Sequence, residues 1–174
     1  MSARTRAPAP TKPIGAGDVG RYRDRIYDDP RHDPYQAKAK VADGSTCPDC
    51  GLSFVKGRWT RAPSAKPAHD ARCPACRRIA DRMPAGTLEL EGPYAEAHAD
   101  ELLHLIRHVA EREGHDHPLH RIMAVERDGG RLRVTTTDVH LPQRMLEAVR
   151  SAHRGEGEIR YASHEYQAHA AWRR

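Results

Sequence analysis

Apolar positions recur with two different periods in the C-terminal half of the chain, residues 85–174, which predicts an α+β unit. Residues 87–91 alternate polar and apolar side chains as a strand does, and the pattern stops at Gly92 and Pro93. Residues 94–113 place leucine, isoleucine and valine at the spacing of one helix face, and we expect this helix to stop at Gly114.

A second amphipathic helix is expected to begin between Asp138 and Leu141, because Pro142 fits only within the first helical turn, and to end at Gly155. Its apolar stripe consists of Leu141, Met145, Leu146, Val149 and Ala152. The remaining strands are predicted over residues 122–126, 131–135, 158–162 and 166–172, the first two joined by an Asp-Gly-Gly turn. The order β-α-β-β-α-β-β predicts a mostly antiparallel sheet with helices on one face and the other face free.

Residues 42–84 show a much shorter pattern. Phe54 and Val55 suggest a strand, Gly57 a turn, and Trp59 the packing residue of a return strand. Trp59 has two interpretations: it is a core residue that covers the interior of this short segment, or its exposed ring is a stacking platform.

Residues 1–41 are predicted to form a disordered or extended basic tail, because five prolines and nine Lys or Arg leave little apolar surface to bury. Tyr22, Tyr27 and Tyr35 alternate with these basic residues. Such a segment can neutralise phosphates while its rings stack on unpaired bases. A solvated linker without partners has the same composition, so both interpretations stay open.

Charge separates the two halves of the chain. Residues 1–86 hold 17 basic and 9 acidic residues, whereas residues 87–174 hold 12 basic and 15 acidic ones. A polyanionic partner for the first half is the simplest reason for this asymmetry. No run of apolar residues is long enough to span a membrane, and the start of the chain lacks the apolar core of a secretory signal.

The four cysteines of the chain form two matched pairs, Cys47 with Cys50 and Cys73 with Cys76. Two C-x2-C turns separated by 22 residues supply the four thiolates of a closed tetrahedral zinc site. Disulfides would suit a secreted chain, and a redox motif would need only one such pair. We therefore expect residues 42–84 to be a zinc ribbon whose metal replaces the hydrophobic core that so short a segment lacks.

Basic residues gather on this small ribbon. Those expected to contact nucleic acid are Lys56, Arg58, Arg61, Arg77 and Arg78, with Trp59 stacking on a base. Most of them should be exposed in a domain of this size. An ordinary solvated face remains the alternative.

Signs of catalysis are weak. The twelve histidines show no His-Glu-x-x-His arrangement, and the chain has no phosphate loop, nucleophile elbow or dinucleotide fingerprint. A four-thiolate zinc site has no open position for a water, so we expect no enzyme and no small-molecule substrate. Residues 135–138, Thr-Thr-Thr-Asp, could receive a phosphate at a helix start, but helix capping is the simpler interpretation.

Several blocks of sequence resemble a family of small, largely uncharacterised bacterial zinc-ribbon proteins. They are Cys47-Pro-Asp-Cys-Gly51, Lys56-Gly-Arg-Trp59, Cys73-Pro-Ala-Cys-Arg-Arg-Ile79 with residues 81–86, and residues 117–124 and 135–141. The resemblance covers the chain from about Asp33 onward. The first two blocks are also similar to a ribbon of the archaeal and eukaryotic adaptor of the nonsense-mediated-decay type that binds the large ribosomal subunit. These resemblances imply a ribosome-binding ribbon followed by a small RNA-binding-like α+β module.

Three hypotheses follow for the function. The first is a cytoplasmic, non-enzymatic, zinc-dependent RNA-binding protein that acts on the ribosome, where it contacts rRNA during stress or hibernation. The second is a protein-interaction adaptor that uses the ribbon and the open face of the sheet. The third is a redox sensor in which oxidation of the thiolates ejects zinc.

Overall fold

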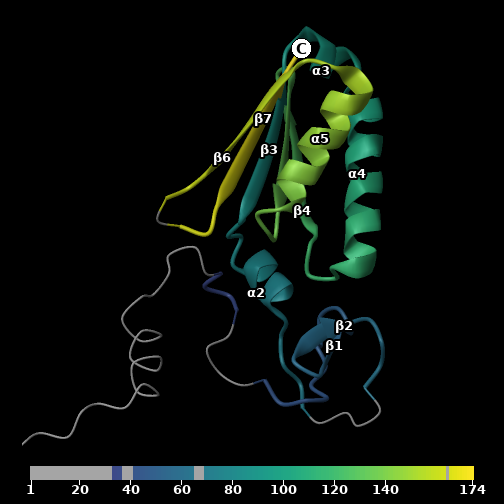
Figure 1. The fold of residues 1–174 in the computed structure, drawn as a ribbon, viewed down its shortest axis with the longest axis vertical. Helices are drawn as coiled ribbons and strands as arrows, with labels where there is room; N and C mark the ends of the chain where they lie inside the picture. Colours follow the sequence, from purple (N-terminus) through teal and green to yellow (C-terminus); the bar gives the residue numbers. More distant parts are fainter. Residues whose placement is uncertain (1–32, 37–40, 65–68, 164) are drawn as a thin grey trace, which may run out of the picture.

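The structure, a computed structural model, describes residues 33–36, 41–64, 69–163 and 165–174 (Figure 1). The predictions for residues 1–32 and 37–40, including Tyr22 and Tyr27, lie outside these described residues. The α+β class is confirmed, with a small cysteine-bearing ribbon preceding a five-stranded sheet that carries helices.

The sheet has the strand order β4-β5-β3-β7-β6. Its strands are β3 (Gly86–Glu91), β4 (Ile122–Asp128), β5 (Arg131–Thr136), β6 (Glu156–Tyr161) and β7 (Ala168–Arg173). All neighbouring pairs are antiparallel except β3 and β7, which run parallel. The prediction of a mostly antiparallel sheet is therefore confirmed.

Three helices, α3 (Pro93–Ala97), α4 (Ala99–Asp116) and α5 (Leu141–His153), cover one face of the sheet (Figure 1). Alternate residues of the central strands, such as Leu88 and Leu90 of β3 and Val134 of β5, are buried against them. The same core takes in Ile106 of α4 and Val149 of α5. Pro142 lies in the first turn of α5, as predicted.

Two details of the helices differ from the prediction. The first helix breaks at His98, where φ is −116° and ψ is 23°, and it continues through Gly114 to Asp116. Gly114 fails as a stop because it is buried and its carbonyl accepts a hydrogen bond from Arg61 of the ribbon, a tertiary contact that outweighs the low helix propensity of glycine. On α5, Ala152 is exposed and His153 takes the buried position.

The opposite face of the sheet carries charged side chains that pair across strands. Arg131 on β5 contacts Glu91 on β3 at 2.7 Å, and Arg133 contacts Glu89 at 3.4 Å. His169 on β7 lies 3.3 Å from the same Glu89. This face is free of covering elements among the described residues, as predicted, but its charges largely compensate one another.

The ribbon contains the predicted hairpin, formed by β1 (Ser53–Val55) and β2 (Arg58–Thr60). Lys56 and Gly57 make the turn, with φ of +50° and +80°. A third element, α2 (Pro74–Ala80), was not predicted. Cys73 is its N-cap and Pro74 its first residue, so the second cysteine pair opens a helix and does not form a free loop.

The ribbon and the α+β unit contact each other. Arg61 donates to the carbonyl of Gly114 at 2.9 Å, and Leu119, in the loop after α4, packs against the cysteines. Part of the predicted tail is also ordered: the carboxylate of Asp33 pairs with Arg78, and the Tyr35 hydroxyl donates to Asp81 at 2.9 Å. The bounds of the tail stay a prediction, but residues 33–36 make specific polar contacts with the ribbon at and just after α2.

Candidate metal centre

The four cysteines come together at one point of the ribbon. Their sulfur atoms all lie within 4.8 Å of one another, and the sulfurs of Cys50 and Cys73 are 3.7 Å apart. None of the four is in a disulfide. Four sulfurs around a tetrahedral ion with metal–sulfur bonds of about 2.3 Å stand ~3.8 Å apart, so the cluster fits a closed four-thiolate metal site.

The first cysteine pair is shaped by a tight turn. The N–H of Gly51 donates to the carbonyl of Cys47 at 2.8 Å, and the N–H of Cys47 donates to the carbonyl of Leu52 at 2.8 Å. Gly51 has φ of +73°, which favours glycine. The turn brings Cys47 and Cys50 to the same side of the backbone.

The second pair is held by helix α2. The sulfur of Cys73 accepts the N–H of Cys76 at 3.4 Å, and the sulfur of Cys47 accepts the N–H of Cys73 at 3.3 Å. Backbone N–H groups aimed at sulfur stabilise the thiolate form that binds a metal. Both pairs therefore carry the hydrogen bonds that a thiolate centre requires.

Arg121 of the α+β unit reaches across to this cluster. Its guanidinium donates to the sulfur of Cys50 at 3.3 Å and to the sulfur of Cys76 at 3.6 Å. Its Nε donates to the carbonyl of Pro118 at 2.8 Å, and its backbone N–H donates to the hydroxyl of Thr137 at 2.9 Å. The side chain is thus fixed at both ends, and its charge faces the thiolates.

The thiol pKa values follow from these surroundings. Burial raises the pKa of Cys73, and it raises the pKa of Cys76 to about 11. Burial acts in the same direction on Cys50, but hydrogen bonds, foremost from Arg121, outweigh it and lower that pKa to about 7. Hydrogen bonds from Arg121 thus stabilise the Cys50 thiolate, whereas burial opposes ionisation of Cys73 and Cys76.

Sequence reasoning did not identify Arg121. It lies 45 residues beyond the last cysteine, within the block of residues 117–124, and nothing in its local pattern marks it as a partner of sulfur. Only the docking of the ribbon on the α+β unit reveals the contact.

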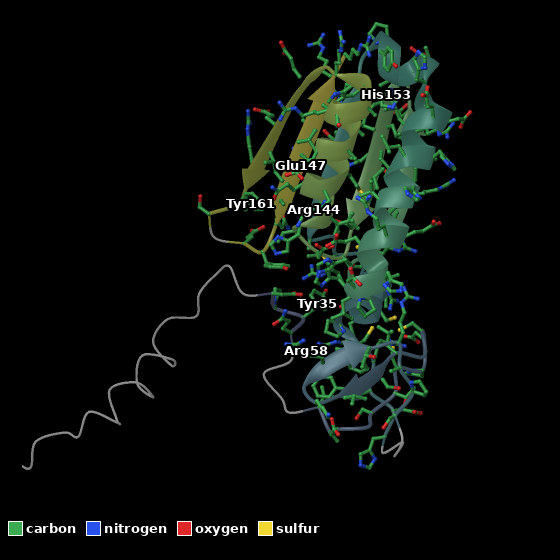
Figure 2. The ribbon with its side chains drawn as sticks, turned by 45° about the vertical axis from the view of Figure 1, so that its right-hand side comes forward. Tyr35, Arg58, Arg144, Glu147, His153 and Tyr161 are labelled. Carbon is green, nitrogen blue, oxygen red and sulfur yellow. The ribbon has the colours of Figure 1, made fainter. Side chains whose placement is uncertain are left out.

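The basic residues predicted to bind nucleic acid are placed differently from one another. Lys56 and Arg58 are exposed on the hairpin, and neither side chain has an ion-pair partner among the described residues. Figure 2 shows Arg58 at the ribbon end of the molecule. Their exposure agrees with the prediction, and their contact with nucleic acid stays a prediction.

Arg61, Arg77 and Arg78 are engaged within the protein. Arg61 bonds Gly114, and the guanidinium of Arg77 donates to the carbonyl of Tyr35. Arg78 is only 4% exposed. The prediction that Arg78 contacts nucleic acid is wrong, because its guanidinium donates to Met83 and to Asp33 and lies 4.3 Å from the centre of the Tyr35 ring.

Trp59 takes the core position of the first interpretation, while stacking on a base stays a prediction. The ring packs against the cysteine cluster and meets Phe54 edge-on, with ring centres 5.4 Å apart. It is half-buried, and its remaining surface lines a groove of about 1040 Å³ between the ribbon and the loop after α4.

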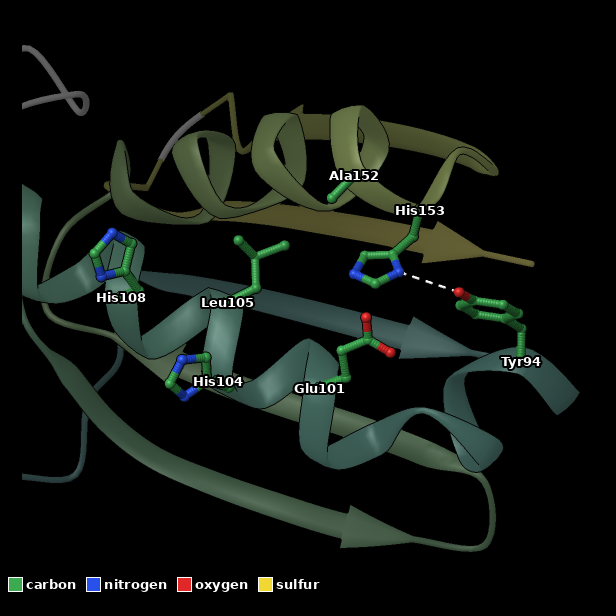
Figure 3. Close-up of a pocket in the computed structure, with 7 residues that line it drawn as sticks. All are labelled: Tyr94, Glu101, His104, Leu105, His108, Ala152 and His153. Atoms are coloured by element: carbon green, nitrogen blue, oxygen red, sulfur yellow. Dashed lines mark hydrogen bonds between the residues drawn. The ribbon is translucent and has the colours of Figure 1, made fainter.

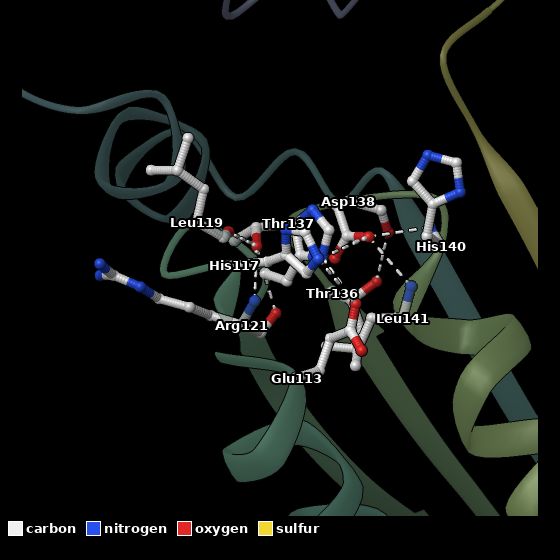
Figure 4. Close-up of polar contacts among 10 residues, drawn as sticks. Glu113, His117, Leu119, Arg121, Thr136, Thr137, Asp138, His140 and Leu141 are labelled. Atoms are coloured by element: carbon white, nitrogen blue, oxygen red, sulfur yellow. Dashed lines mark hydrogen bonds and ion pairs between the residues drawn. The ribbon is translucent and has the colours of Figure 1, made fainter. Parts of the chain in front are cut away.

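The Thr-Thr-Thr-Asp run caps α5, as the simpler interpretation predicted (Figure 4). One carboxylate oxygen of Asp138 accepts the N–H groups of His140 and Leu141 at 2.8 and 2.9 Å. The hydroxyls of Thr136 and Thr137 donate to the carbonyls of Asp138 and Leu119. Two N–H groups at the helix start are thus satisfied within the protein, by Asp138.

Histidines line a second hollow, of about 530 Å³, between α4 and α5 (Figure 3). His104 and His108 are exposed there, and His153 bonds the hydroxyl of Tyr94 at 3.1 Å. The four cysteines are the one group of potential ligands that gathers around a point in the described part of the chain.

No protein-family model, curated protein or solved structure matches the chain. None of the helices in the described ranges combines the length and hydrophobicity of a membrane span.

Proposed function

We propose that the protein is a non-enzymatic, zinc-dependent RNA-binding protein that acts on the ribosome. The observation that carries the proposal is a hairpin beside four clustered cysteines on which Lys56 and Arg58 are exposed and have no ion-pair partner among the described residues. A folded hairpin fixes the backbone that carries these cations, so less backbone entropy is lost when phosphates bind.

Zinc is the metal that this ligand set favours. Thiolates are soft ligands, and four of them in a closed, largely buried set are typical of structural zinc. The closed set leaves no position for an activated water, which supports a structural role. Elemental analysis of the purified protein should find about one zinc per chain.

The polyanion is best identified as RNA. The first half of the chain is strongly basic, and its hairpin combines cations with an aromatic ring, as single-stranded RNA readers do. The resemblance of the ribbon to that of a large-subunit adaptor points to ribosomal RNA in the cytoplasm as the target. The partner is then rRNA and not a small molecule.

Sedimentation of a cell lysate through a sucrose gradient tests the ribosome proposal. At low salt the protein should move with ribosomal subunits or ribosomes, in growing or in starved cells, and return to the top at high salt. A protein that stays at the top under all these conditions contradicts the proposal.

Charge reversals on the hairpin provide the matched test. The double variant Lys56→Glu, Arg58→Glu should weaken RNA binding by about tenfold or more, because two phosphate contacts are lost. Arg107→Glu with Arg150→Glu changes the same number of exposed charges on α4 and α5 and should have a much smaller effect. Equal losses in the two double variants would mean that net charge, and not the hairpin, governs binding.

An adaptor role is the alternative. Partners that remain bound after nuclease treatment and at high salt would favour it over RNA binding. The open face of the sheet gives this role little support, because Arg131, Arg133 and His169 are already paired with glutamates.

A further inference from the structure

The groove between the ribbon and the α+β unit has two walls of different origin. The ribbon supplies Phe54, Trp59 and Pro74, and the loop after α4 supplies Pro118 and Leu119. Its volume of about 1040 Å³ is at the upper end of the range of ligand pockets, roughly 300–1,000 Å³. Apolar and aromatic surface therefore stays open at a junction where two units already meet.

The groove is lined by more positive than negative charge. Arg58, Arg72 and Arg77 line it, whereas Asp116 is the one carboxylate among the lining residues. Arg72 is partly neutralised by Asp49 at 2.6 Å, and Arg77 is held in place by the Tyr35 carbonyl. Arg58 has no ion-pair partner among the described residues, so it is the cation best able to bind a phosphate at the groove edge.

An aromatic platform beside fixed cations suits one kind of occupant. Trp59 offers a half-exposed ring that Phe54 supports edge-on, and Leu119 faces the same groove from the other unit. A base can enter only when it is unstacked, because the bases of a duplex cover one another. A neutral or basic peptide would not use the arginines, whereas a nucleotide chain carries both a phosphate for Arg58 and a base for Trp59 at each step.

We propose that this groove binds an unpaired segment of RNA, with a base against Trp59 and the adjoining phosphate on Arg58. The proposal rests on the proposed RNA-binding function and narrows it to single-stranded nucleotides at the junction of the two units. The N-terminus of α2 is not part of the site, since Cys73 caps it.

Tryptophan fluorescence of the full chain provides a direct readout. The protein has two tryptophans, and Trp172 is only 1% exposed in the core of the α+β unit. Adding an unlabelled single-stranded RNA of about ten nucleotides should therefore quench Trp59 alone. The quenching should be absent from Trp59→Phe and unchanged in Trp172→Phe.

Affinity measurements with a fluorescein-labelled copy of the same RNA complete the test. Trp59→Leu should weaken single-strand binding by about tenfold without changing its salt dependence, whereas Arg58→Ala should weaken binding and reduce the salt slope by about one. Arg107→Ala, on α4, is the control. Bound zinc is measured in each variant to check that the metal site is intact. Leu119→Ala removes a side chain from the opposite wall of the groove and leaves Phe54 and Trp59 unchanged.

Four results would overturn the inference. The first is a duplex of the same sequence that binds as tightly as the single strand. The second is normal RNA binding by Trp59→Leu and Arg58→Ala, together with no quenching of Trp59 in the unaltered chain. Either result would place RNA binding elsewhere and leave the proposed function standing. Adenosine monophosphate that binds as tightly as the strand would make the groove a site for free nucleotides. Failure of the metal-loaded protein to bind any RNA would refute the proposed function together with the inference.

Discussion

At the scale of single residues, the main feature is the pairing of a guanidinium with a thiolate cluster. Four thiolates around a divalent ion leave a net charge of about −2, which is costly to hold at a half-buried site. Arg121 donates to two of the sulfurs and is itself oriented by Pro118 and Thr137. The α+β unit therefore contributes directly to the stability of the metal site.

Replacement of Arg121 tests this contribution. Arg121→Gln should lower the affinity for zinc by about 10- to 100-fold, as loss of a group that bonds metal ligands typically does. Competition with a chromophoric chelator measures the change. Arg121→Lys keeps the charge but loses the double contact, so its zinc affinity should lie between those of the unaltered protein and Arg121→Gln. Equal affinity in all three proteins would show that the guanidinium does not support the site.

A second residue-scale prediction concerns the buried pair of Arg78 and Asp33, whose side chains are 4% and 10% exposed. Asp33→Ala leaves the guanidinium without its carboxylate and should destabilise the protein by about 3 kcal/mol. Urea unfolding measures this loss. The double variant Asp33→Ala, Arg78→Met should recover part of it, whereas the exposed Arg82→Ala should change stability by about 0.5 kcal/mol or less.

Both residue-scale contacts were beyond sequence reasoning. The four cysteines were found because their spacing alone defines the ligand set. Arg78, in contrast, cannot be told from a surface cation in the sequence, because nothing in Cys-Arg-Arg-Ile marks one arginine as buried. Its partner Asp33 lies 45 residues away in a segment whose composition suggested no structure.

At the scale of elements, turn residues and periodicity carried the prediction. Asp128-Gly129-Gly130 fixes the hairpin of β4 and β5, and Pro142 fixes the first turn of α5, because both act on the local backbone. Helix α2 is not predicted because seven residues are too few for a clear helical period, and one of its buried positions is the charged Arg78. The strand order β4-β5-β3-β7-β6 was also not predictable, since neighbours in a sheet are selected by tertiary packing.

Removal of the metal should separate the elements. The ribbon core consists mainly of the cysteines, Leu52 and Ala75, whereas the core of the α+β unit includes neither cysteine nor ribbon side chain. A chelator should therefore unfold β1, β2 and α2 and leave α4 and α5 intact.

Circular dichroism and single-tryptophan variants measure this separation. Far-ultraviolet helicity should fall after chelation only by the contribution of the seven-residue α2. The emission of Trp59 in Trp172→Phe should shift to longer wavelength, and that of Trp172 in Trp59→Phe should not. A cooperative loss of both signals would show that the two units fold as one.

At the scale of the whole molecule, charge and rigidity are divided between the units. The ribbon presents Lys56 and Arg58 without ion-pair partners among the described residues, whereas the open face of the sheet pairs its charges internally. The α+β unit thus supports the ribbon through Arg121, Leu119 and Gly114, and our proposal places the polyanion on the ribbon.

The most direct measurement follows zinc content and RNA affinity together in one sample of the purified full chain during stepwise chelation. The expected result is about one zinc per chain at the start, a loss of RNA affinity in proportion to the zinc removed, and recovery of both when zinc is restored. A protein that carries no zinc, or that binds RNA equally well after its zinc is gone, would contradict a metal-held RNA-binding surface.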